Sequence, residues 1–189
     1  PELLNIAGND LHQICQALAA PQAESSPTRF HNSVQNAPSG YWSIATRSHA
    51  PSNTVNGLNT VFALALLEAM VQVQIEQRDV LVVCYDVPLP EPLYAIEPHS
   101  HACGVAMVLG LAANDLSLAA IEVARIPGRP LEIASMADAA LEALRIGSPV
   151  GQALPLLQCL ASRETGRLGF DLDAHAVLQV DLHALAGAS

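Results

Sequence analysis

Apolar residues recur along the chain in two patterns, one typical of helices and one of buried strands. Helical spacing predicts helices over 9–20, 58–77, 136–145 and 150–162. Continuous apolar runs predict strands over 79–86, 103–111, 116–125 and 176–182. The helix over 58–77 is apolar nearly all round, so it must be buried on most sides. The order predicts one α/β domain over residues 1–189, with a mixed sheet and a buried central helix.

The first sixty residues give weaker patterns. A strand is predicted over 3–6, a short helix over 41–46 and a short strand over 52–55. Pro, Ser, Asn and Gln are frequent over 21–40, which predicts a long loop, and long loops in compact domains are often functional.

Two expectations concern how the strands pair. Asn114 and Asp115 lie between the strands over 103–111 and 116–125, so these two strands are predicted to form a hairpin. The strand over 79–86 is continuously apolar, as is typical of a strand inside a sheet that is covered on both faces.

The segment over 51–69 predicts a strand, a tight turn and a buried helix. Many acyl-transferring enzymes present a nucleophile on such a turn, where the helix N-terminus stabilises a developing negative charge. Here the turn carries Asn56, Gly57, Leu58 and Asn59, with neither Cys nor Ser. It therefore resembles the scaffold of an acyl-enzyme without the reactive atom.

Charge narrows the classes of partner. Acidic residues outnumber basic ones 18 to 8, Lys is absent, and the net charge is -10. This balance argues against nucleic acid and anionic membranes, because phosphate contacts need clustered basic residues. The most apolar run, over 61–73, contains Glu68 and is too short to span a bilayer.

The four cysteines lie far apart in apolar surroundings, which predicts free thiols in a cytoplasmic protein rather than a disulfide framework. We expect no cofactor.

Six segments of the chain together carry a family resemblance. They are Ser-Pro-Thr-Arg-Phe-His-Asn-Ser-Val-Gln-Asn-Ala-Pro-Ser-Gly-Tyr-Trp-Ser-Ile-Ala-Thr (26–46), Ala-Pro-Ser (50–52), Leu-Leu-Glu-Ala (66–69), Val-Leu-Val-Val-Cys-Tyr-Asp (80–86), Pro-Glu-Pro-Leu (90–93) and Gly-Val-Ala (104–106). The chain resembles the β-ketoacyl synthase group of the thiolase superfamily. It is most similar to short, chain-length-factor-like proteins of aryl polyene and related fatty-acid-type gene clusters. The resemblance is good over 5–112 and weak beyond.

The resemblance implies a thiolase-like fold with stacked α, β, α, β and α layers, present here in part or as one half, and usually dimeric. The family's first strands and helix are missing from the N-terminus, so the chain is expected to be a fragment or a processed product. A ketosynthase holds its acyl chain on a Cys at the strand-to-helix turn, and this resemblance places Asn59 at that position. Asn cannot form a thioester, and the two His motifs of the family's C-terminal half have no counterpart.

Two readings remain open for the turn residues Asn59 and Asn56. The resemblance suggests that Asn59 could hydrogen-bond an acyl thioester carbonyl, as a substituted residue does in non-condensing chain-length-factor subunits. The alternative is that Asn59 caps the helix, since Asn is a good N-cap residue. Asn56 shares both readings.

The polar segment before the turn supplies the other candidates for substrate binding, His31 and Asn36, together with Asn32. In the family this segment approaches the active-site region. The alternative is local turn chemistry, because Asn side chains readily hydrogen-bond the nearby backbone. Tyr41 and Trp42 are expected to be packing anchors rather than ligand contacts.

A metal site is the weaker interpretation of His99, His101 and Cys103. On a strand, this spacing would point all three side chains to one side, and together they could bind Zn²⁺. No fourth ligand is identifiable, however, and the resemblance puts a plain strand start here, so we expect no metal. Cys84 and Cys103 are not expected to replace the missing nucleophile, because burial in an apolar strand raises a thiol pKa.

The sequence thus predicts a non-condensing ketosynthase-like protein of polyketide or fatty-acid-type assembly, without its nucleophile. Its expected partners are acyl carrier protein or an acyl thioester and a catalytic ketosynthase, in a heterodimer or homodimer. The alternatives are a weak acyltransferase or thioesterase, and a purely structural homo-oligomer.

Overall fold

The computed structural model describes residues 6–21, 26–91, 93–95 and 98–185. They form two compact units: unit 1 comprises the described residues of 1–56 and 87–100, and unit 2 those of 57–86 and 101–189. The prediction of one domain over the whole chain stays a prediction. The strand predicted over 3–6 falls mostly outside the described residues, and its last position, Ile6, begins a helix.

Unit 1 is helical, with α1 (Ile6–Ala19), α2 (Pro27–Ser33), α3 (Ala37–Thr46) and the short 3-10 turn η2 (Leu93–Ala95). The short helix predicted over 41–46 is confirmed as part of α3. The long loop predicted over 21–40 is wrong for most of its length. Both α2 and α3 carry Pro in the first turn, where the fixed φ and the missing N–H of proline suit a helix start.

The strand predicted over 52–55 is also wrong, because residues 50–57 form no regular element. An extended segment becomes a strand only when a neighbour pairs its backbone, and none of the described strands does so. The segment contacts α3 instead, since the hydroxyl oxygens of Ser39 and Thr54 lie 3.4 Å apart.

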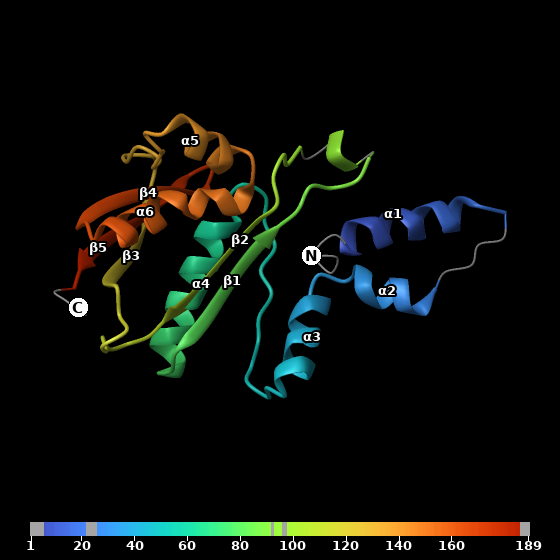
Figure 1. Ribbon diagram of the computed structural model, residues 1–189, viewed down its shortest axis with the longest axis horizontal. Helices are drawn as coiled ribbons and strands as arrows, with labels where there is room; N and C mark the ends of the chain where they lie inside the picture. Colours follow the sequence, from blue (N-terminus) through green and yellow to red (C-terminus); the bar gives the residue numbers. More distant parts are fainter. Residues whose placement is uncertain (1–5, 22–25, 92, 96–97, 186–189) are drawn as a thin grey trace. The chain divides into compact units, whose positions relative to one another are not determined.

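Unit 2 places the helix α4 (Val61–Glu76) between two sheets (Figure 1). Sheet A consists of β1 (Val80–Asp86) and β2 (Cys103–Leu109), and sheet B has the strand order β3 (Ala119–Pro127), β5 (Ala176–Ala184) and β4 (Gly166–Asp173). Three helical segments connect β3 to β4, namely α5 (Ala139–Ile146), the 3-10 helix η3 (Pro149–Ala153) and α6 (Leu154–Ser162). The predicted buried central helix is confirmed.

The strand pairing differs from the predicted hairpin. In sheet A, β2 pairs with β1 in one continuous antiparallel register, from Val80 opposite Leu109 to Asp86 opposite Cys103. The next strand, β3, pairs with β5, so the chain crosses from one sheet to the other over 110–118. The predicted turn exists, because the Ser117 amide donates to the Asn114 carbonyl at 3.0 Å, but it joins strands of different sheets.

Strand β4 carries too weak a pattern to be found in the sequence. Gly166 and Gly169 interrupt its apolar positions, and its charged residues resemble a loop. Gly169 is required by a close approach, since a Cβ there would lie 2.5 Å from the Glu132 carbonyl oxygen. The Ala134 amide donates to the Gly169 carbonyl at 2.8 Å, so the segment before α5 covers this edge of sheet B.

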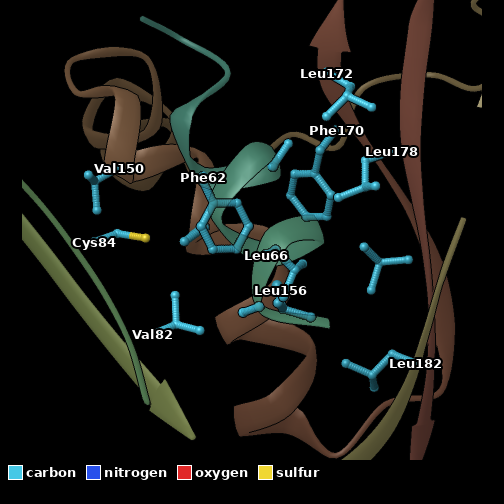
Figure 2. Close-up of a cluster of buried hydrophobic side chains, with 14 of the residues drawn as sticks. Phe62, Leu66, Val82, Cys84, Val150, Leu156, Phe170, Leu172, Leu178 and Leu182 are labelled. Atoms are coloured by element: carbon cyan, nitrogen blue, oxygen red, sulfur yellow. The ribbon is translucent and has the colours of Figure 1, made fainter. Parts of the chain in front are cut away.

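The core of unit 2 forms on both sides of α4 (Figure 2). Phe62 and Leu66 of α4 lie between β1, which contributes Val82 and Cys84, and the side chains of sheet B. The rings of Phe62 and Phe170 meet edge to face with their centroids 5.4 Å apart, a favourable aromatic geometry.

The outer faces of the two sheets are opposite in character. On sheet A, we call the outward positions the sheet A apolar face: Leu81, Val83, Tyr85, Gly104, Ala106 and Val108. Val83 is 53% exposed and Val108 65% exposed, so the prediction that both faces of this sheet are covered is wrong for the described chain. On sheet B the outer face is polar, with the Arg167 guanidinium donating to Asp181 at 2.6 Å.

A charged network holds α5 against η3. Arg145 donates to both carboxylate oxygens of Glu142, at 2.6 and 2.7 Å, and the Met136 amide donates to the same carboxylate at 2.8 Å. Arg145 also donates to Gln152 of η3 at 2.5 Å. The hydrogen bonds from Arg145, and then that from Met136, lower the pKa of Glu142 from 4.5 to about 2.

The core packing predicts a large effect of Leu66→Ala. Leu66 is 1% exposed, so its truncation leaves a cavity and should lower the free energy of unfolding by about 3 kcal/mol. Ile75→Ala in the same helix is the control, because Ile75 is 75% exposed and its truncation should change stability by only about 0.5 kcal/mol. Urea unfolding measures both, and equal losses would contradict the central placement of α4.

The Glu142 network predicts an acid-dependent loss of stability. A carboxylate whose folded pKa is depressed stabilises the fold above its unfolded pKa, and this contribution disappears as pH falls towards the folded value. The stability difference between the wild type and Glu142→Gln should therefore be largest above pH 4.5 and shrink steadily towards pH 2. Urea titrations at several pH values test this, and a pH-independent difference would refute it.

Candidate functional site

The turn before α4 begins the candidate site. The Val61 amide donates to the Leu58 carbonyl at 3.1 Å, and the Leu64 amide donates to Thr60 at 3.0 Å. The N-cap residue is Thr60, whose side chain forms no capping hydrogen bond. The alternative that Asn59 caps the helix is therefore wrong, because the helix begins one residue later. Asn59 is exposed and makes no hydrogen bond with another described residue.

The four predicted binding residues are all exposed and fall on two units. Asn59 belongs to unit 2, whereas His31, Asn36 and Asn56 belong to unit 1. A positively polarised helix start beside Asn59 could favour a carbonyl oxygen or another negative group. A role of these four residues in binding an acyl substrate stays a prediction.

Local contacts in unit 1 organise the residues around His31. The His31 ring meets Tyr41 edge to face at 5.9 Å, and the Tyr41 hydroxyl donates to the Asn32 side-chain oxygen at 2.7 Å. Asn36 precedes α3, and its backbone carbonyl accepts from the Ser39 hydroxyl at 2.8 Å, whereas its side chain forms no capping hydrogen bond. Trp42 is 56% exposed, so its expected role as a packing anchor is wrong for the described chain.

Three of the four cysteines have raised thiol pKa values. All four are free thiols. Burial, and secondarily the neighbouring Cys103, raises the pKa of Cys84. Burial and the Asp86 carboxylate raise the pKa of Cys103, and burial together with Glu164 raises that of Cys159. Thiols held in their protonated form are poor nucleophiles.

A buried polar contact that the sequence pattern missed lies at the end of sheet A. Ser148 is 1% exposed, donates to the Asp86 carboxylate at 3.3 Å and accepts from the Val150 amide at 3.2 Å. The only sequence signal is Asp86 itself, a carboxylate at the end of an apolar strand. Because Ser148 is buried, we assign it the structural task of joining η3 to β1.

A shallow apolar groove lies between α4 and the edge strand β3. Its volume is about 420 Å³, and its lining consists of Leu67, Met70, Val71, Gln74, Ile75, Ile121, Glu122 and Val123. This groove and the sheet A apolar face are two uncovered apolar surfaces of unit 2.

The described residues hold no cluster of three or more His, Cys, Asp or Glu side chains suited to a metal ion. His99 belongs to unit 1, while Cys103 opens β2 in unit 2. Within the described part of the chain, no helix is both long and apolar enough to cross a bilayer.

Comparison with known proteins identifies the family. A model of the "Beta-ketoacyl synthase, N-terminal domain" matches residues 10–163, whereas no curated protein sequence matches the chain. A solved structure, "Ketosynthase (ApeO) in Complex with its Chain Length Factor (ApeC) from Xenorhabdus doucetiae", contains a similar chain with a TM-score of 0.65 and 21% identity. The match covers 92% of this chain and 64% of that chain, so the present sequence spans less than two thirds of its neighbour. The likeness shows a thiolase-like ketosynthase fold, and the extent of the family match shows that the chain belongs to the β-ketoacyl synthase family.

Proposed function

We propose that the chain is a non-condensing partner of a catalytic ketosynthase in fatty-acid or polyketide-type biosynthesis, as in aryl polyene pathways. The observation that carries this proposal is the turn before α4, which presents Asn59 and no thiol where the family resemblance puts the nucleophile. The raised pKa values of Cys84, Cys103 and Cys159 support it, because none of these thiols is activated. The solved neighbour, a ketosynthase with its chain length factor, offers a precedent for such a pair.

The contrast between the two sheets supports a protein partner for unit 2. A sheet face normally exposed to water carries polar side chains, as sheet B does with Arg167 and Asp181. The sheet A apolar face has no charged residue, and exposed apolar surfaces of this kind mark interfaces. We therefore place the ketosynthase contact on this face, in a heterodimer located in the cytoplasm.

Binding of an acyl thioester, presented by acyl carrier protein, is the second part of the proposal. Asn59 would donate from its side-chain amide to the thioester carbonyl beside the α4 N-terminus. The same geometry favours a second candidate, weak thioester hydrolysis, because polarising that carbonyl also makes its carbon more reactive toward attack by water.

Intact-protein mass spectrometry tests the absence of covalent chemistry. After incubation with malonyl- or acyl-loaded carrier protein, the chain should gain no acyl mass, whereas a condensing ketosynthase run in parallel should. A stable acyl adduct on this chain would overturn the non-condensing assignment.

Asn59→Ala should weaken acyl-thioester binding about tenfold, the loss expected for one hydrogen bond to a polarised carbonyl. Stability should not change, because Asn59 makes no hydrogen bond with the described residues. Calorimetry with a non-hydrolysable acyl thioester measures the affinity, and Gln158→Ala, exposed on α6, is the control. Steady hydrolysis of an acyl thioester that disappears in Asn59→Ala would establish the thioesterase function. An affinity for the acyl thioester that Asn59→Ala leaves unchanged would show that Asn59 is not part of the binding site.

Val83→Arg should disrupt the partner contact by placing a charge on the sheet A apolar face. The affinity of the variant for a ketosynthase from a neighbouring gene should fall at least about tenfold, since a buried unpaired charge opposes association. Sedimentation analysis measures this affinity. Ala124→Arg, on the exposed outer side of β3, is the matched control and should bind normally. Self-association that Val83→Arg abolishes, without ketosynthase binding, would favour the structural homo-oligomer.

A further inference from the structure

The strand β3 has one paired edge and one free edge. In sheet B the strand order is β3, β5 and β4, so β3 bonds β5 on one side, and no described segment hydrogen-bonds its other side. The outer edge of β4 differs, because the Ala134 amide donates to the Gly169 carbonyl there at 2.8 Å. The free edge of β3 is thus a row of backbone N–H and C=O groups that have no hydrogen-bond partner among the described residues.

This free edge lacks the features that usually keep a strand from pairing with another chain. β3 runs for nine residues in one continuous register with β5, from Ala119 opposite Ala184 to Pro127 opposite Ala176, so no bulge bends it. It contains no Lys, and its single proline is its last residue. A long, regular free edge of this kind is a template for an additional strand.

The apolar groove between α4 and β3 borders this same edge (Figure 1). Three consecutive residues, Ile121, Glu122 and Val123, form its β3 wall, although successive side chains of a strand point to opposite faces. One face would contribute only every second residue, so the wall is the edge of β3 itself. The opposite wall is a stripe of α4 at helical spacing, in which Val71 is 44% and Ile75 75% exposed. A strand added to β3 would place every second side chain against this stripe.

Glu122 adds a negative charge to the groove that the fold does not neutralise. Its side chain is exposed and makes no ion pair or hydrogen bond with any described residue. Its cross-strand neighbour on the outer face of sheet B is Asp181, a second carboxylate, which already accepts from Arg167 at 2.6 Å. A basic residue opposite Glu122 on an added strand would form a favourable cross-strand pair.

We propose that the free edge of β3 and its groove bind an extended segment of a partner protein, which pairs with β3 as an additional strand. The segment carries apolar residues at alternate positions, which fill the groove against α4, and between them an Arg or Lys that faces Glu122. A bound helix fits less well, because a helix satisfies its own backbone groups and leaves those of β3 unpaired.

Charge favours a partner segment over a second copy of β3. Residues that lie directly opposite each other in paired strands point to the same face of the sheet, so Glu122 meets an outward residue of the added strand. The other outward residues of β3 are apolar, and its one arginine, Arg125, lies opposite the buried Leu178 and hence on the inner side. A second β3 would therefore offer Glu122 no positive charge.

Fluorescence anisotropy with labelled peptides tests the inference on the full chain. The probe is a short peptide that alternates Val and Thr, with Arg at one central Thr position. A second peptide has Gln in place of the Arg, and a third has the composition of the first in a scrambled order without alternation. The Arg peptide should bind about threefold more tightly than the Gln peptide and about tenfold more tightly than the scrambled peptide. The preference for Arg should fade as salt rises.

Variants of the chain separate the charge of Glu122 from the apolar contact. Glu122→Gln should abolish the preference for the Arg peptide, whereas Glu132→Gln, which removes the same charge from another exposed residue of unit 2, should keep it. Val71→Arg should weaken the Arg and Gln peptides alike by at least about tenfold, because it places a charge in the groove. Val83→Arg, on the sheet A apolar face, should leave peptide binding unchanged. Circular dichroism should show each variant folded.

Amide hydrogen exchange identifies how the peptide binds. Strand addition gives the unpaired N–H groups of β3 a hydrogen-bond acceptor, so the bound Arg peptide should slow the exchange of amides in β3. The amides of β2, in the other sheet, are the internal control and should exchange at the same rate with and without the peptide.

Equal binding of the alternating and scrambled peptides would overturn the proposal, as would an Arg preference that survives Glu122→Gln or binding without protection of β3. Tighter binding of an amphipathic helical peptide would overturn it in favour of a helix in the groove. Self-association of the chain that Val71→Arg abolishes would assign the edge to a second copy. The ketosynthase contact proposed on sheet A involves other residues, so the two proposals can fail separately.

Discussion

A helix that is apolar on nearly every side requires cover on nearly every side, and α4 imposes this requirement on unit 2. Sheet A covers it on one flank through Val82 and Cys84, and sheet B on the other through Phe170. Each sheet in turn needs an apolar inner face, which fixes the register of its strands. The positions left uncovered, the groove beside β3 and the outer face of sheet A, follow from the same arrangement.

The two units differ in the character of their exposed residues. In unit 2, five arginines are paired with carboxylates, as in the pair between Arg125 and Asp173, and the conspicuous exposed feature is apolar. In unit 1, charge and aromatic surface occur together on short helices with few buried side chains. A protein that assembles with others would use both kinds of surface, because apolar burial gives affinity and charge gives selectivity.

The sequence predicts those elements that local pattern determines. The helix α4 and the strands β1, β2 and β5 are evident because uninterrupted apolar runs have few alternatives. The pattern misses β4, whose Gly169 is set by the approach of another segment, and it misjudges the partner of β3, since pairing is decided over long distances. In the candidate site, the family resemblance gives the position of Asn59, but the buried contact between Ser148 and Asp86 depends on how η3 reaches the end of β1.

The crossing between the two sheets has a consequence for the order of folding. Strands β1 and β2 pair across a short stretch of chain and next to α4, so these three elements can form early and cooperatively. Strand β3 must wait for β5, near the C-terminal end, because Ala119 pairs with Ala184. During synthesis on the ribosome, β3 therefore emerges long before its partner and exposes an unpaired edge. Until β5 pairs with β3, only sheet A covers α4. During that time a chaperone or an assembling subunit can contact the other side of the helix.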